Sequence, residues 1–296
     1  MELSVHVRAA SDLDGELTLN RLARLDHSSR LAPAVTTAAS ILNGSALTHC
    51  AFGTEFCENL LPTPEALQLA RAAARARGLR FTFLTPYVSN AGLRRVRELF
   101  HLLQDDEVVF SDWGVLNLLR REFPKLVPIQ GRLLNKSLRD PRIMSIYASA
   151  PAQPATLAAL QRSNLDNESY TRFLARMGVA AVELDNLPQG MDLSFAGNGL
   201  GVGVWFPFGF ISTSRVCMAA GLHYRKADKF TPGAPCRHEC QTHLVEYTYT
   251  TSPFPQNRDQ KFYLRGNTYF YVHTEAMLQA LLDHRISRLI FQPRLL

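Results

Sequence analysis

The feature of this sequence that most restricts its fold is a repeated alternation between short apolar runs and longer helical stretches. The apolar runs predict strands at 5–8, 46–52, 79–84, 107–110, 126–130, 179–185, 200–210 and 288–291. The stretches between them predict helices at 16–42, with an interruption at Pro33, and at 64–77, 91–103, 113–121, 165–177 and 275–284. Because strands that alternate with helices pair in parallel, the pattern predicts an α/β fold with helices outside a parallel sheet.

A closed TIM-like (β/α) barrel, complete or distorted, fits about eight alternations better than an open doubly wound sheet does. A dinucleotide-binding sheet would carry G-x-G-x-x-G after its first strand, but residues 8–20 contain only Gly15. We expect one domain over residues 1–296, with 215–272 as a cysteine-rich and β-rich insertion. Tyr, Thr and Phe at 244–251 and 260–271 predict a hairpin in this insertion. The Pro-, Ala- and Ser-rich residues 141–154 predict a long loop.

The cysteines are the residues whose chemistry stands out. Cys217, Cys236 and Cys240 fall within 24 residues with the spacing C-x18-C-x3-C, and Cys57 follows the predicted second strand. Because the working face of a barrel lies at the carboxyl ends of its strands, we expect these four thiols on one rim. Cys50 lies inside the predicted second strand, so we expect a small buried hydrophobic residue there.

The spacing leaves three roles open for the four thiols. Soft thiolates bind zinc or iron–sulfur clusters. A four-thiolate zinc site usually combines two closely spaced pairs, whereas scattered cysteines suit a [4Fe–4S] cluster in a preformed pocket. His238 and His243 keep zinc open as an alternative, and buried structural thiols are the third.

Charged residues at the ends of predicted strands are candidates for a pocket on the same rim. Asp112, Arg132 and Glu183 are the candidate catalytic residues, with Asp185 and Arg215 beside them. Asp112 suits a helix N-cap equally well. Arg132 and Arg215 can bind a carboxylate or balance the negative charge of a cluster.

Composition excludes few classes of partner. The sequence has 32 Lys and Arg residues and 26 Asp and Glu residues, which gives a net charge of +6. This charge permits an anionic substrate, a nucleic acid or an acidic partner. Motifs of serine hydrolases, H-E-x-x-H metalloproteases and phosphate-binding loops are absent from the sequence. The sequence has no apolar run long enough to span a membrane and no secretion signal, so we expect a soluble cytoplasmic protein. Its five cysteines are an odd number, and we therefore expect no disulfides.

Several short segments of the sequence resemble the collagenase-like peptidase family (peptidase U), and most closely its short, UbiV-like members of oxygen-independent ubiquinone biosynthesis. The matching pieces are Gly53-x3-Cys57, the V-F-S-D-x-G-V-x-N run at 109–117, Arg215-x-Cys217 with Cys236-x3-Cys240, and the late strand at 286–291. The x18 gap, the aromatic segment at 244–271 and the segment at 141–154 depart from the pattern of that family.

The resemblance implies a TIM-like barrel with a [4Fe–4S] cluster on Cys57, Cys217, Cys236 and Cys240. It also implies a component of an anaerobic hydroxylase that acts on a small aromatic quinone precursor, in a heterodimer with a paralogous barrel protein. Alternatives within the same resemblance are hydroxylation of RNA bases, a non-catalytic subunit stabilised by its metal, and a peptidase.

Overall fold

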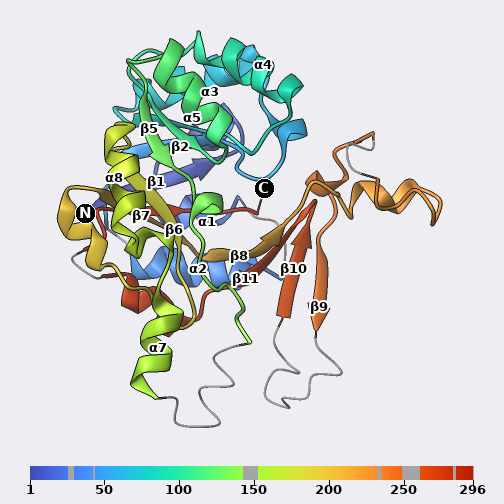
Figure 1. Ribbon diagram of the computed structural model, residues 1–296. Coiled ribbons are helices and arrows are strands. Elements are labelled where there is room, and N and C mark those ends of the chain that lie inside the picture. Colours follow the sequence, from blue (N-terminus) through green and yellow to red (C-terminus); the bar gives the residue numbers. More distant parts are fainter. Residues whose placement is uncertain are drawn as a thin grey trace.

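Eight parallel strands close into a barrel (Figure 1) in the order β1, β12, β7, β6, β5, β4, β3, β2. The computed structural model describes residues 1–25, 30–42, 44–142, 153–231, 235–248, 261–282 and 285–295. The barrel strands are β1 (Glu2–Val7), β2 (His49–Gly53), β3 (Arg80–Leu84), β4 (Glu107–Phe110), β5 (Val127–Gln130), β6 (Ala181–Asp185), β7 (Gly201–Phe206) and β12 (Arg288–Phe291). The predicted TIM-like barrel is therefore confirmed, and its ring of eight strands is complete.

Helices surround the barrel and connect its strands. They are α1 (Leu19–Ala23), α2 (Ala32–Ile41), α3 (Pro64–Ala76), α4 (Asn90–Phe100), α5 (Trp113–Glu122), α7 (Pro154–Gln161), α8 (Glu168–Arg176) and α9 (Glu275–Gln279). The shorter 3-10 turns are η1 (Ala10–Leu13), η2 (Glu58–Leu60), η3 (Arg132–Leu134), η4 (Asn164–Asp166), η5 (Ser194–Asn198), η6 (Ala220–His223), η7 (Glu239–Gln241) and η9 (Ala280–Leu282). Side chains of Thr63, Ser89 and Thr274 accept backbone N–H groups at the starts of α3, α4 and α9, which explains where these helices begin.

The structure corrects two of the predicted helical boundaries. Pro33 does not interrupt a helix but lies in the first turn of α2, where the missing N–H of proline leaves no hydrogen bond unmade. Pro154 begins α7 rather than ending a loop, for the same reason. Of the predicted loop at 141–154, residues 143–152 lie outside the described residues, as do 283–284 of the last predicted helix.

The side chains of each barrel strand alternate between the helices and the barrel interior. In β1, Leu3, Val5 and Val7 belong to the large apolar core, whereas Ser4 and His6 are buried polar residues on the opposite face. The middle of the interior is a separate apolar cluster, made of Ala51, Leu84, Val109, Ile129, Trp205 and Ile290. Polar residues follow this layer at the carboxyl ends of the strands, the end at which TIM barrels carry their active sites.

The part of the chain between β7 and α9 forms a second, antiparallel sheet that extends to one side of the barrel (Figure 1). Its strands lie in the order β8 (Phe208–Thr213), β11 (Thr268–Val272), β10 (Lys261–Arg265), β9 (Val245–Thr248). The apolar run at 200–210 is thus a pair of strands, β7 and the start of β8, separated by Pro207. Residues 249–251 and 260 of the predicted hairpin lie outside the described residues. None of the helices described has the length and apolar character needed to cross a membrane.

Candidate functional site

Four of the five cysteines line one cavity of about 50 Å³, which we call the thiol cavity. Cys57 lies between β2 and η2, Cys217 follows β8, Cys236 lies just before η7, and Cys240 lies within η7. The sequence led us to expect Cys217 after a barrel strand, but it follows a strand of the antiparallel sheet because the chain leaves the barrel at the end of β7. The thiol cavity therefore lies where the barrel rim meets the second sheet.

Cys50 is separate from these four residues. It is fully buried in the large apolar core, on the face of β2 that packs against the helices. Burial raises the pKa of its thiol to about 12. Cys50 therefore behaves as a small core residue and provides an internal control for the other cysteines.

Backbone amides donate hydrogen bonds to two of the sulfur atoms. The N–H of Ala220 lies 3.4 Å from Sγ of Cys217, and the N–H of His238 lies 3.3 Å from Sγ of Cys236. His238 has φ of 61°, a left-handed conformation that is uncommon for a residue with a side chain and that is often kept at functional sites. Neither histidine lines the thiol cavity, but His238 lines an adjoining cavity together with Cys57 and Cys236, so the structure brings His238 beside two of the thiols.

Burial and mutual proximity both disfavour bare thiolates in this cavity. Burial, with a smaller effect from neighbouring thiols, raises the pKa of Cys57 and of Cys240 to about 11. Burial also raises the pKa of Cys217. A bound cationic centre would reverse this effect, because a metal stabilises the thiolates that coordinate it.

The turn between β10 and β11 holds the cysteine loops together. The side-chain amide of Asn267 donates to the carbonyl oxygens of Phe56 and Ser214, both at 2.7 Å. The Arg265 guanidinium donates to the carbonyl of Cys240 at 2.7 Å and to that of the next residue at 2.9 Å. Sequence reasoning missed both residues, because an R-G-N turn between aromatic strands is typical of any β-hairpin.

Asp112, the first of the three candidate catalytic residues, is the N-cap of α5. Its Oδ1 accepts the N–H of Gly114 at 2.7 Å. Asp112 lines neither the thiol cavity nor the mouth cavity, which is a second cavity at the carboxyl end of the barrel. Its carboxylate is occupied by the helix end, which is the second role that the sequence allowed.

Arg132 is fully buried and follows the carboxyl end of β5. It forms ion pairs with Glu55 at 3.0 Å and with Asp185 at 3.1 Å, and it donates to the carbonyl of Phe208 at 3.1 Å. The centre of its guanidinium lies 4.3 Å from the ring centroid of Trp205. Because protein groups occupy its donors and it lines neither cavity, Arg132 organises the site and does not hold a ligand carboxylate.

Glu183 also lies inside the barrel, away from both cavities. Its Oε2 accepts the indole N–H of Trp205 at 2.7 Å. Burial raises the pKa of Glu183 to about 8, and the nearby Glu55 carboxylate adds to this shift. The protonated carboxyl group thus supports Trp205, which does line a cavity.

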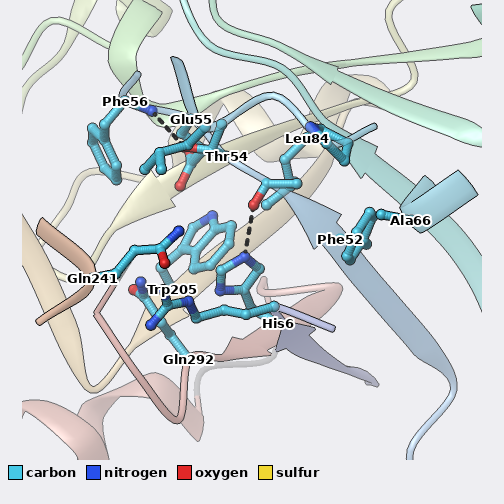
Figure 2. A pocket seen from close by; sticks show the side chains of 14 residues that line it. His6, Phe52, Thr54, Glu55, Phe56, Ala66, Leu84, Trp205, Gln241 and Gln292 are labelled. Atoms are coloured by element: carbon cyan, nitrogen blue, oxygen red, sulfur yellow. Dashed lines mark hydrogen bonds between the residues drawn. The ribbon is translucent and has the colours of Figure 1, made fainter. Parts of the chain in front are cut away.

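A second cavity of about 170 Å³, the mouth cavity, opens at the carboxyl end of the barrel (Figure 2). Figure 2 shows His6 and Trp205 on one side of it, near Gln241 and Gln292, with Phe52 on the other side. Leu60 lines both the mouth cavity and the thiol cavity. The two cavities are therefore neighbours.

Two buried polar atoms on residues of the mouth cavity have no hydrogen-bond partner in the described structure, Nδ1 of His6 and Oε1 of Glu55. Nε2 of His6 lies 3.1 Å from the carbonyl oxygen of Gly53. Since a carbonyl only accepts, Nε2 carries the hydrogen and Nδ1 is a bare acceptor. Burial lowers the pKa of His6 to about 4, so the ring is neutral at pH 7.

Comparison with known proteins gives no family. No protein-family model matches the chain, and no curated protein matches its sequence. A dihydropteroate synthase from Anaplasma phagocytophilum with bound 6-hydroxymethylpterin-monophosphate is 16% identical with a TM-score of 0.30, over 69% of this chain and 78% of that chain. A glycoside hydrolase family 18 N-acetylglucosaminidase from Paenibacillus barengoltzii is 11% identical with a TM-score of 0.34, over 98% and 94%. These likenesses are too distant to support an inference about ligand or activity.

We predict that Asp112→Ala lowers the free energy of unfolding by about 0.5–2 kcal/mol, because it removes the N-cap of α5. Asp112→Asn should retain most of the stability, since its amide oxygen can still accept the N–H of Gly114. Urea unfolding of both variants measures the difference. Equal stability of Asp112→Ala and the wild type would show that the cap is not the role of this residue.

We predict that Glu183→Gln removes a decline in stability between pH 4.5 and 8. In the wild type the unfolded chain loses the Glu183 proton near pH 4.5, whereas the native protein holds it to about pH 8. Stability therefore falls as pH rises, by about 1.4 kcal/mol for each pH unit of this window.

Chemical denaturation at pH 5, 6.5 and 8 checks this prediction. The variant and the wild type should have similar stability at pH 5, and the variant should be the more stable protein at pH 8. Glu98→Gln, at an exposed position of α4, is the matched control and should keep the pH dependence of the wild type. A parallel pH dependence of Glu183→Gln and wild type would contradict the assignment.

Proposed function

We propose that this chain is an iron–sulfur protein that holds a [4Fe–4S] cluster on Cys57, Cys217, Cys236 and Cys240. The observation that carries the proposal is that these four thiols, from two distant parts of the sequence, line one cavity. A [4Fe–4S] cluster is held by four cysteine thiolates. All five cysteines are free, and reduced thiols suit a cytoplasmic location, which we propose as well.

The dimensions of the thiol cavity favour a cluster over a single zinc ion. Zinc–sulfur bonds of about 2.3 Å would draw the sulfur atoms tightly around the metal. The thiols instead surround about 50 Å³, whereas a single water molecule needs only about 10–15 Å³. The space suits a ligand larger than one ion.

The surroundings of the thiols also suit coordinated thiolates. The amides of Ala220 and His238 donate to the sulfur atoms of Cys217 and Cys236. Arg215 lines the same cavity and contributes positive charge. Hydrogen-bond donors and cations both stabilise the charged form of a thiol. When bound, a [4Fe–4S] cluster supplies electron transfer.

We further propose that the protein takes part in oxygen-independent hydroxylation of a small aromatic quinone precursor. The resemblance of its cysteine pattern to short members of the collagenase-like peptidase family supports this role, and a paralogous barrel protein is the partner that we expect. The mouth cavity beside the thiol cavity offers a place for the substrate. If water supplies the oxygen, exchanging a ring hydrogen for hydroxyl releases two electrons and two protons, so an oxidised electron-carrier protein must accept the electrons.

We predict that anaerobically purified protein contains about four iron and four sulfide ions per chain and absorbs near about 400 nm. Alanine substitution of Cys57, Cys217, Cys236 or Cys240 should remove most of the iron. Cys50→Ala should keep it, because Cys50 lies in the apolar core. Metal analysis, sulfide determination and absorption spectra measure each variant.

Protein without iron and sulfide would refute the proposal. Stoichiometric zinc would show that the four thiols bind a zinc ion in place of a cluster. Thermal unfolding of the same variants separates two roles of a cluster. A structural cluster contributes its binding free energy to folding, so its loss unfolds the chain. A functional cluster leaves an iron-free protein that remains folded.

A further inference from the structure

Arg8, just beyond the end of β1, brings an unpaired positive charge to the mouth cavity. Its side chain is partly buried, and it has no hydrogen-bond or ion-pair partner among the residues that the structure describes. Asp12, whose carboxylate acts on the charge of Arg8, is used by Arg294 and by backbone amides that include the N–H of Arg8 itself. A guanidinium at a cavity whose donors have no protein partner can bind an anionic ligand, so the site favours such a ligand.

Glu55, the acidic residue that lines the mouth cavity, forms no ion pair with Arg8 in the described structure. Glu55 forms its ion pair with Arg132, at 3.0 Å. Burial lowers the pKa of Arg8 and the neighbouring Arg265 and Arg294 lower it further, whereas Cys240 and Asp12 act in the opposite direction. A guanidinium binds a carboxylate through two parallel hydrogen bonds, which makes this group the best match for Arg8.

The remaining walls select what the carboxylate is attached to. Trp205, Phe52 and Phe56 line the cavity and offer aromatic surface. Nδ1 of His6 and Oε1 of Glu55 are buried acceptors without partners, so each can accept a hydrogen bond from a ligand hydroxyl group. At about 170 Å³, the cavity is below the roughly 300–1,000 Å³ of pockets that hold drug-sized ligands. It suits a molecule with one ring.

We propose that the mouth cavity binds a single-ring aromatic carboxylate that carries a hydroxyl group, with Arg8 on the carboxylate and His6 or Glu55 on the hydroxyl. This inference names the class of substrate for the reaction in the proposed function. That the bound acid is hydroxylated rests on the proposed function, whereas binding of the acid in the mouth cavity does not. Arg8 thereby sets the specificity for an acid over a neutral ring.

Isothermal titration calorimetry on the full chain, purified anaerobically with its iron, tests the assignment. The probes are 4-hydroxybenzoate and its neutral isostere 4-hydroxybenzamide. We expect the acid to bind one molecule per chain and the amide to bind roughly 10- to 100-fold more weakly, the range for a hydrogen-bonded charge. Benzoate, which lacks the hydroxyl, should bind more weakly than 4-hydroxybenzoate.

Arg8→Met should lose the preference for the acid while leaving the affinity for the amide unchanged. Arg8→Lys keeps the charge without the planar fork and should lose only part of the preference. Arg24→Met is the matched control, because Arg24 is exposed and does not line the mouth cavity, and it should bind as the wild type does. Equal affinities of the wild type for acid and amide would overturn the proposal without any variant, as would an unchanged preference in folded Arg8→Met.

The iron content of the same samples separates this inference from the proposed function. Acid-selective binding by protein that holds no iron would refute the cluster and keep the cavity assignment. Iron-loaded protein that does not discriminate between acid and amide would refute the cavity assignment and keep the cluster.

Discussion

The buried ion pairs of Arg132 are the interaction on which the working end of the barrel depends. This guanidinium joins Glu55, which follows β2, to Asp185 at the end of β6, and it also bonds the first residue of β8. Removing one partner of such a network leaves an uncompensated buried charge, which is far more costly than the net gain from the pair. The network therefore fixes the relative positions of the barrel rim and the sheet that carries the cysteine loops.

The loop after β2 connects this network to both cavities. Glu55 takes part in the ion pairs and lines the mouth cavity, Leu60 lines both cavities, and Cys57 between them lines the thiol cavity. The turn at Asn267 then ties the same loop to the segment before Cys217. One short stretch of chain, from Glu55 to Leu60, therefore contributes to the ion pairs and to both cavities.

Local patterns predicted most of the barrel, because apolar runs and helix caps depend on neighbouring residues. The strands β4 and β12 begin and end where the pattern places them. Candidate side chains were harder to interpret. Asp112 caps a helix, and Arg132 is saturated by protein partners. No motif near Arg8 in the chain marks an arginine that has no partner within the described structure.

The sequence by itself determined the alternation of strands and helices, and it singled out four cysteines while setting Cys50 aside. These properties follow from hydrophobic period and chain order, which are local. Only the tertiary structure decided that Asn267 and Arg265 clamp the cysteine loops and that the positive charge at the barrel mouth is Arg8 rather than Arg132. Ion pairing and burial depend on residues far apart in the chain, so they become defined only once the barrel has closed.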